Sequence, residues 1–135
     1  MTDAELVAKK LARIETLLVE LRTLGRPERI GTDVKEERFL AHTLQLATQS
    51  VLDIASHIVS DERLGEPESY RDLFDRLARG GWIAADLAQR LGRMAGFRNL
   101  LVHDYAALDL EILREVVVHR ISDLEAFAGA IRARI

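Results

Sequence analysis

Apolar residues recur at steps of three and four along almost the whole chain, which is the spacing of one face of an α-helix. The first apolar stripe has steps of four, three, four and three positions and consists of Val7, Leu11, Ile14, Leu18 and Leu21. This stripe predicts an amphipathic helix over residues 3–24, ended by Gly25-Arg26-Pro27.

Capping residues, glycines and the apolar period predict four more helices. They run from Thr32 or Asp33 to about Ser60, over residues 70–79, over residues 83–105 and from Leu110 to about Ile131. Val116-Val117-Val118 is the one strand-like run, and the helical period around it overrules its β-propensity. No segment alternates usefully with period two. The sequence therefore predicts a single all-α domain over residues 1–135, an antiparallel bundle of about five helices.

Composition removes several classes of function. The 135 residues contain no cysteine, which excludes disulfides, cysteine-based zinc sites and thiol chemistry. Nineteen Lys and Arg against 22 Asp and Glu give a net charge of −3, so any contact with nucleic acid needs a local basic patch. The acidic start has no signal-peptide pattern and no apolar run reaches the length of a spanning helix. We expect a cytoplasmic protein without a membrane partner.

The second predicted helix has a polar stripe along one side. From Phe39 to Val59 its only formally charged side chain is Asp53, which suggests burial on more than one side. The polar stripe steps by three or four positions and consists of His42, Gln45, Gln49, Asp53 and His57. It is either an ordinary solvent-facing side or a polar cleft or symmetric dimer seam in which Asp53 meets a cation.

The fourth predicted helix contains a candidate cation. Arg98 continues the apolar phase of Leu87, Leu91 and Met94, and an arginine is rarely buried without a partner. Arg98 therefore pairs with a carboxylate such as Asp53 or lines a pocket for an anion. A neighbouring stripe contains Gly92, Gly96, Asn99 and His103, in which Asn99 lies one turn before His103 and within reach of a hydrogen bond to it.

The segment from Arg98 to Tyr105 resembles the R-x4-H-x-Y motif of HepT-like proteins, which belong to the HEPN superfamily of α-helical ribonucleases. The resemblance covers roughly residues 5–130. It extends to Leu52-Asp53-Ile54-Ala55, to Ser69-Tyr70 and to Gly96-Phe97. It implies a HEPN-like fold and a homodimer, in which two motif helices meet across a cleft and form a metal-independent RNA-cleaving site.

The same resemblance implies a toxin of a toxin–antitoxin pair, neutralised by an MNT-type nucleotidyltransferase that attaches AMP to Tyr105. In this interpretation His103 takes the proton of a ribose 2′-hydroxyl, and Arg98 stabilises the charge on the phosphorane. The expected product is a 2′,3′-cyclic phosphate. Asn99 orients the histidine or the phosphate, and Asp53 is a candidate support for Arg98. The alternative is a non-catalytic dimeric helical module that binds a nucleotidyltransferase.

Two further patterns concern RNA and metals. Residues 76–98 hold five arginines against Asp86 alone, a local charge of +4 that either steers phosphates or is simply a solvated face. The pairs Asp53/His57 and Glu115/His119 have i, i+4 spacing without forming HExxH or Glu-x-x-His motifs. We therefore expect no metal ion and no cofactor.

Overall fold

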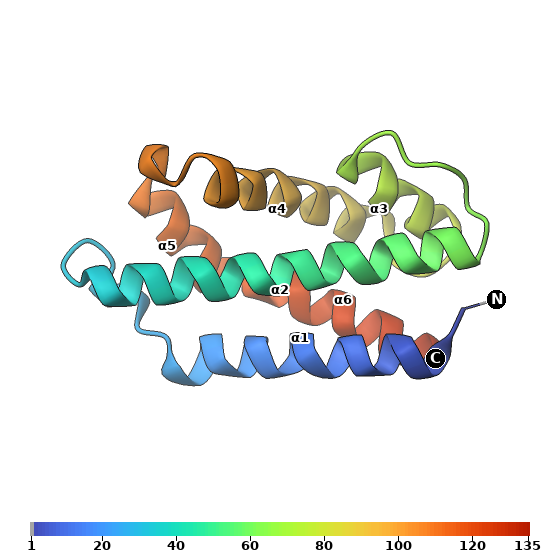
Figure 1. Ribbon diagram of the computed structural model, residues 1–135, viewed down its shortest axis with the longest axis horizontal. Coiled ribbons are helices and arrows are strands. Elements are labelled where there is room, and N and C mark those ends of the chain that lie inside the picture. Colours follow the sequence, from blue (N-terminus) through green and yellow to red (C-terminus); the bar gives the residue numbers. More distant parts are fainter. Residues whose placement is uncertain (1) are drawn as a thin grey trace.

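The computed structural model describes residues 2–135, which form α-helices and two short 3-10 turns (Figure 1). In chain order the elements are α1 (Ala4–Leu24), η1 (Pro27–Arg29), α2 (Val34–Asp61), α3 (Tyr70–Arg79), α4 (Ala85–His103), η2 (Tyr105–Ala107), α5 (Leu110–His119) and α6 (Ile121–Arg134). The described part of the chain contains no strand, and the valine run lies within α5. The predicted all-α bundle is confirmed.

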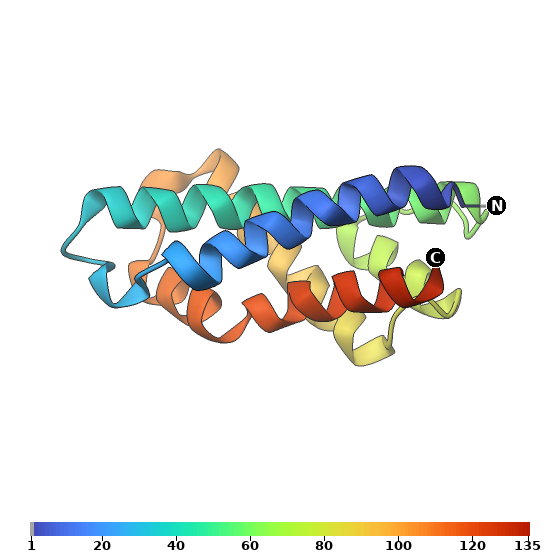
Figure 2. The same cartoon turned by 90° about the horizontal axis from the view of Figure 1, so that it is seen from below.

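Helix α2 is the centre of the bundle. It packs against every other α-helix, with α1 on one side and α3 and α4 on the other. Figures 1 and 2 show α1 and α4 running antiparallel to α2, while α6 returns along α1 to the end where both termini lie. Buried residues occur on several sides of α2, from Leu40 to Val59, as its low charge predicts.

Side-chain caps fix where the helices begin. Asp33 is the cap of α2, and its carboxylate accepts hydrogen bonds from the backbone N–H groups of Lys35 and Glu36. Ser69 caps α3 by accepting from the N–H of Asp72 at 3.0 Å, while Asp72 accepts from the N–H of Glu68 at 3.0 Å. This reciprocal pair satisfies two N–H groups that a helix start otherwise leaves unbonded.

The fifth predicted helix is wrong as a single element, because the chain breaks it into α5 and α6 at Arg120. Here the N–H of Asp123 bonds the carbonyl of Arg120 at 3.0 Å, and the Ser122 hydroxyl donates to the carbonyl of His119. Figure 2 shows the bend between the two segments. The fourth predicted helix is also shorter than expected: α4 ends at His103, and Tyr105 lies in the 3-10 turn η2.

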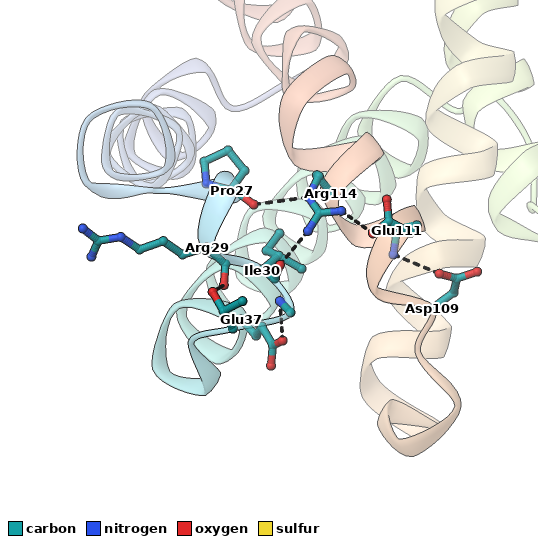
Figure 3. A network of polar contacts seen from close by, with 9 residues as sticks. Pro27, Arg29, Ile30, Glu37, Asp109, Glu111 and Arg114 are labelled. Carbon is teal, nitrogen blue, oxygen red and sulfur yellow. Dashed lines mark hydrogen bonds and ion pairs between the residues drawn. The ribbon is translucent and has the colours of Figure 1, made fainter.

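Arg114 fastens α5 to the connection between α1 and α2 (Figure 3). Its Nε donates to the carbonyl of Pro27 at 3.4 Å, and its Nη2 donates to the carbonyl of Ile30 at 2.5 Å. The third nitrogen, Nη1, pairs with Glu111. These bonds hold α5 in place and therefore also the end of the short link that follows Tyr105.

Across residues 2–135 we find no helix that is both long enough and apolar enough to cross a membrane.

Candidate functional site

The last turn of α4 and the turn η2 together hold the motif residues. Arg98 and Asn99 are half-buried, whereas His103, the last residue of α4, is exposed. Asp104 ends the helix with a non-helical φ of −148° and ψ of 50°, and its N–H donates to the carbonyl of Leu100. Tyr105 follows directly and keeps 40% of its surface exposed.

Arg98 has no carboxylate partner within residues 2–135. Its Nη1 donates to Oδ1 of Asn99 at 2.9 Å, and its Nε is buried without a hydrogen-bond partner. The ion pair with Asp53 that we considered is absent from this protomer. Asp53 lies on the solvent side of α2, where its Oδ1 accepts from Nε2 of Gln49 at 2.9 Å. Within one protomer, the arrangement therefore favours the second alternative, an arginine that faces an anion.

His103 is a free imidazole in the described chain, with neither a hydrogen bond nor an ion pair to its ring. The predicted bond from Asn99 to His103 does not form, because the side-chain oxygen of Asn99 accepts from Arg98. Asn99 therefore contacts the cation of the motif and not its base. An exposed, uncommitted neutral imidazole can accept a proton from a bound ligand at one nitrogen and donate a hydrogen bond from the other.

Two hollows flank the motif and both are bordered by α2. The first, which we name the tyrosine groove, has a volume of about 280 Å³ and is lined by Arg38, Ala41, His42, Gln45, Leu101 and Tyr105. The second lies beside Asn99, has a volume of about 430 Å³ and is lined by Ser56, Pro67, Glu68, Ser69, Tyr70, Leu73 and Asn99. The polar side of α2 thus faces the motif through His42, Gln45 and Ser56.

The polar stripe is only partly explained by this cleft. His42 and Gln45 line the tyrosine groove, whereas Gln49 and Asp53 bond each other. His57 pairs with Asp61 at 3.0 Å, one turn further along, and not with Asp53. In residues 2–135 no three His, Asp or Glu side chains are grouped so as to hold a metal ion.

Arg38 is the residue of the groove that the sequence interpretation missed. It is exposed and lies one turn before His42, so it extends the polar stripe by one step of four. That continuation is visible in the sequence, but Arg38 lies among the charged residues Glu36 and Glu37, and its direction becomes clear only when α4 and η2 are placed beside α2.

The cluster of five arginines over residues 76–98 is largely neutralised. Arg76 and Arg79 both contact Asp72, at 2.9 and 3.8 Å, and Arg90 bridges Asp86 and the buried Asp123 at 3.0 and 2.9 Å. The hydrogen bonds from Asp86 and Asp123 raise the pKa of Arg90. Only Arg93 and Arg98 of this cluster are outside the ion pairs of the described chain, so most of it has a structural role.

The two glycines of α4 have different surroundings. A Cβ at Gly92 would lie 3.6 Å from Cα of Arg71, an ordinary contact with α3. A Cβ at Gly96 would meet nothing within 4 Å. Gly96 is exposed and lies about two turns before His103, on nearly the same face of α4. A second protein chain therefore has room to approach α4 at this point.

Comparison with known proteins agrees with these features. The family model described as "Ribonuclease HepT-like" matches residues 9–131. The mRNA nuclease HepT of Shewanella oneidensis is 33% identical over 130 residues, which cover 96% of this chain and 98% of the relative. The tRNA nuclease HepT of Aphanizomenon flos-aquae is 30% identical over 114 residues, which cover 81% of this chain and 77% of the relative.

A solved structure of similar fold is the tri-AMPylated HEPN toxin of Shewanella oneidensis in complex with an MNT antitoxin. It has a TM-score of 0.87 and 34% identity, covering 98% of this chain and 99% of that chain. The chain therefore belongs to the ribonuclease HepT-like family, with which it shares sequence and fold over almost its whole length.

Proposed function

We propose that this protein is the ribonuclease toxin of a toxin–antitoxin pair and acts on cytoplasmic RNA without a metal ion. In this proposal the site is composed of residues from two protomers, and an MNT-type nucleotidyltransferase neutralises it by attaching AMP to Tyr105. One observation supports it above the others. The half-buried guanidinium of Arg98 has no carboxylate partner in the described protomer and lies on the same helix as the uncommitted imidazole of His103.

His103 and Arg98 have complementary tasks in the cleavage. A nitrogen of His103 takes the proton of a ribose 2′-hydroxyl, and the 2′-oxygen forms a bond to the adjacent phosphorus. The bond from phosphorus to the 5′-oxygen breaks, and that oxygen takes a proton from water to become a hydroxyl, while the protonated His103 returns its proton to the solvent. Arg98 donates hydrogen bonds to the phosphoryl oxygens, on which negative charge increases in the transition state. The products are a 2′,3′-cyclic phosphate and a 5′-hydroxyl end.

Asn99 is a positioning residue in this scheme. Its Oδ1 accepts from Nη1 of Arg98, which limits the directions in which the guanidinium can point. Nη2 and the second N–H of Nη1 then remain available to donate to a phosphate. Holding a cationic group before the substrate arrives reduces the reorganisation needed in the transition state.

A composite site follows from helix geometry. Five residues turn an α-helix by about 500°, so Arg98 and His103 leave the axis of α4 about 140° apart. A phosphodiester on one side of a single α4 is poorly placed to meet both. Two copies related by a two-fold axis bring Arg98 of one protomer near His103 of the other. The open space beside Gly96 is compatible with this approach of two helices.

Tyr105 is suited to be the site of modification. Its side chain is 40% exposed at the end of α4, beside Leu101 and the tyrosine groove. An attached AMP adds a negative phosphate and a bulky nucleoside where RNA has to enter, so it blocks the cleft by repulsion and by size. The similar Shewanella toxin is described in its tri-AMPylated form in complex with an MNT antitoxin, which supports the same regulation here.

The test is cleavage of total cellular RNA by the purified protein in excess EDTA, with analysis of the new ends. His103→Ala is the test variant and His119→Ala is its control, since His119 is also exposed at a helix C-terminus but lies on α5. We expect cyclic-phosphate ends from the wild type and His119→Ala, and none from His103→Ala. Absence of cleavage by a wild type of unmodified mass would favour the binding module, and equal cleavage by His103→Ala would contradict the assigned base.

A further inference from the structure

The tyrosine groove contains polar groups that the cleavage step does not use. Arg38 and His42 lie on consecutive turns of α2, and Gln45 follows on the next turn. The opposite wall is formed by Leu101 and Tyr105 from α4 and η2. A cation, an imidazole and an amide thus converge with one apolar wall in a hollow of about 280 Å³, directly beside the residue that we propose to be modified.

Arg38 is available for a ligand. Its side chain is exposed and has no ion pair in the part of the chain that the structure describes, so binding an anion there breaks no existing pair. Guanidinium groups bind phosphate oxygens through two parallel hydrogen bonds. His42, one turn further, adds an imidazole that can donate a hydrogen bond to the same group.

The other side of the groove suits the nucleoside. The amide of Gln45 has both donors and an acceptor, which match the polar edge of a base. Leu101 lines the base of the groove, and Tyr105, which is 40% exposed, supplies most of the apolar surface against which a sugar or base packs. The ring of Tyr105 offers a face for stacking.

We propose that the tyrosine groove is a subsite for one nucleoside monophosphate unit, in which Arg38 binds the phosphate and Gln45 faces the base. This inference rests on the proposed function, because RNA cleavage and the attachment of AMP to Tyr105 supply the two nucleotides that occupy the subsite. In the active enzyme the unit is a nucleotide of the RNA beside the cleaved bond. After modification it is the adenylate on Tyr105, which then inhibits by filling a place that RNA requires.

The first experiment tests the subsite without cleavage. Adenosine 5′-monophosphate is titrated into the isotope-labelled full chain, and backbone amide shifts are followed by NMR. We expect shifts at Arg38, His42, Gln45, Leu101 and Tyr105, with weaker binding of adenosine alone and of inorganic phosphate alone. Arg38→Gln should weaken the binding of the monophosphate about tenfold, as loss of one charge-assisted contact predicts.

The matched control is Arg13→Gln, which removes the same charge from an exposed position on α1, on the other side of α2. It should change binding less than twofold. Shifts outside the groove, or equal binding by Arg38→Gln and wild type in a folded protein, would overturn the subsite.

The second experiment separates RNA from the attached adenylate as the occupant. Binding of a labelled single-stranded oligoribonucleotide is measured with His103→Ala protein, so that no cleavage is needed. Arg38→Gln in this background should weaken RNA binding about tenfold, and saturating adenosine 5′-monophosphate should compete with the RNA. If both binding results hold but the wild type does not cleave RNA, the proposed ribonuclease activity is refuted and the subsite stands. If neither Arg38→Gln nor adenosine 5′-monophosphate weakens RNA binding, the tyrosine groove is not a subsite for RNA.

Discussion

Arg98 and His103 lie five residues apart on the uninterrupted helix α4, and their side chains leave its axis about 140° apart. The guanidinium contacts Asn99, and the imidazole has no partner in the described protomer. Neither residue forms an ion pair within residues 2–135 that would explain its place in the sequence. Their separation around the helix makes a second protomer the simplest way to bring both to one phosphate.

The contact between Asn99 and Arg98 predicts a charge effect on activity. Asn99→Asp keeps an acceptor for Nη1 but places a negative charge beside the cation that binds phosphate. We expect kcat/KM for RNA cleavage to fall at least tenfold with an unchanged circular-dichroism spectrum. Asn99→Ala should lower kcat/KM less, since it removes the contact that orients Arg98 without adding a negative charge. Equal activity of Asn99→Asp and wild type would contradict the role given to this pair.

The open space at Gly96 predicts opposite effects on the protomer and on the dimer. Gly96→Ala meets no atom within 4 Å of its new Cβ, so the helix should gain about 0.5–1 kcal/mol in stability from the better helix former. If the motif helices approach each other there, the same methyl group should weaken the dimer in sedimentation experiments.

Gly129→Ala is the control for this substitution, because Gly129 is also exposed in a helix with nothing within 4 Å. It should give a similar gain in urea denaturation and leave dimerisation unchanged. Identical dimer dissociation constants for Gly96→Ala, Gly129→Ala and wild type would show that the helices do not meet at Gly96.

The start of α3 predicts an acid-sensitive contribution to stability. The N–H of Glu68, followed by the guanidinium of Arg76, holds the pKa of Asp72 below its ordinary value. A carboxyl whose pKa is lowered by folding stabilises the protein above its unfolded pKa of about 3.9 and loses this contribution as the pH falls through the folded value. Asp72→Asn should therefore lower the urea midpoint at pH 7, and the difference from wild type should shrink below about pH 4.

The control for that series is Asp75→Asn on the same helix. Asp75 is exposed and has no hydrogen bond or ion pair among residues 2–135. Its substitution should shift the midpoint little at any pH. A difference between Asp72→Asn and wild type that stays constant from pH 7 to pH 3 would contradict the pairing of Asp72 with Glu68 and Arg76.

Most of the fold could be predicted because the information is local. The apolar stripe of α1, the cap at Asp33 and the glycines after α3 each determine a helix or its end through contacts within a few residues. The break at Arg120 could not be predicted in this way. The apolar period continues in phase from Val117 through Ile121, so the period itself carries no sign of the bend.

The site could be predicted as a motif but not as a set of contacts. The order of Arg98, His103 and Tyr105 is visible in the sequence, whereas the partner of each side chain depends on how helices pack. Asp53 faces solvent and bonds Gln49, which no spacing argument distinguishes from an approach to Arg98. The support of Arg98 by Asp53 stays a prediction, and it would require Asp53 of one protomer to contact Arg98 of the other.

Mixed dimers test the composite site most directly. Arg98→Ala and His103→Ala chains with different affinity tags are co-expressed, and the mixed dimers are purified by both tags and identified by native mass spectrometry. If Arg98 of one protomer acts with His103 of the other, each mixed dimer keeps one complete site of two and should cleave RNA at about half the wild-type rate. Each homodimer should be inactive. Inactive mixed dimers of confirmed composition would contradict the composite site, because the two residues would then have to act within one chain.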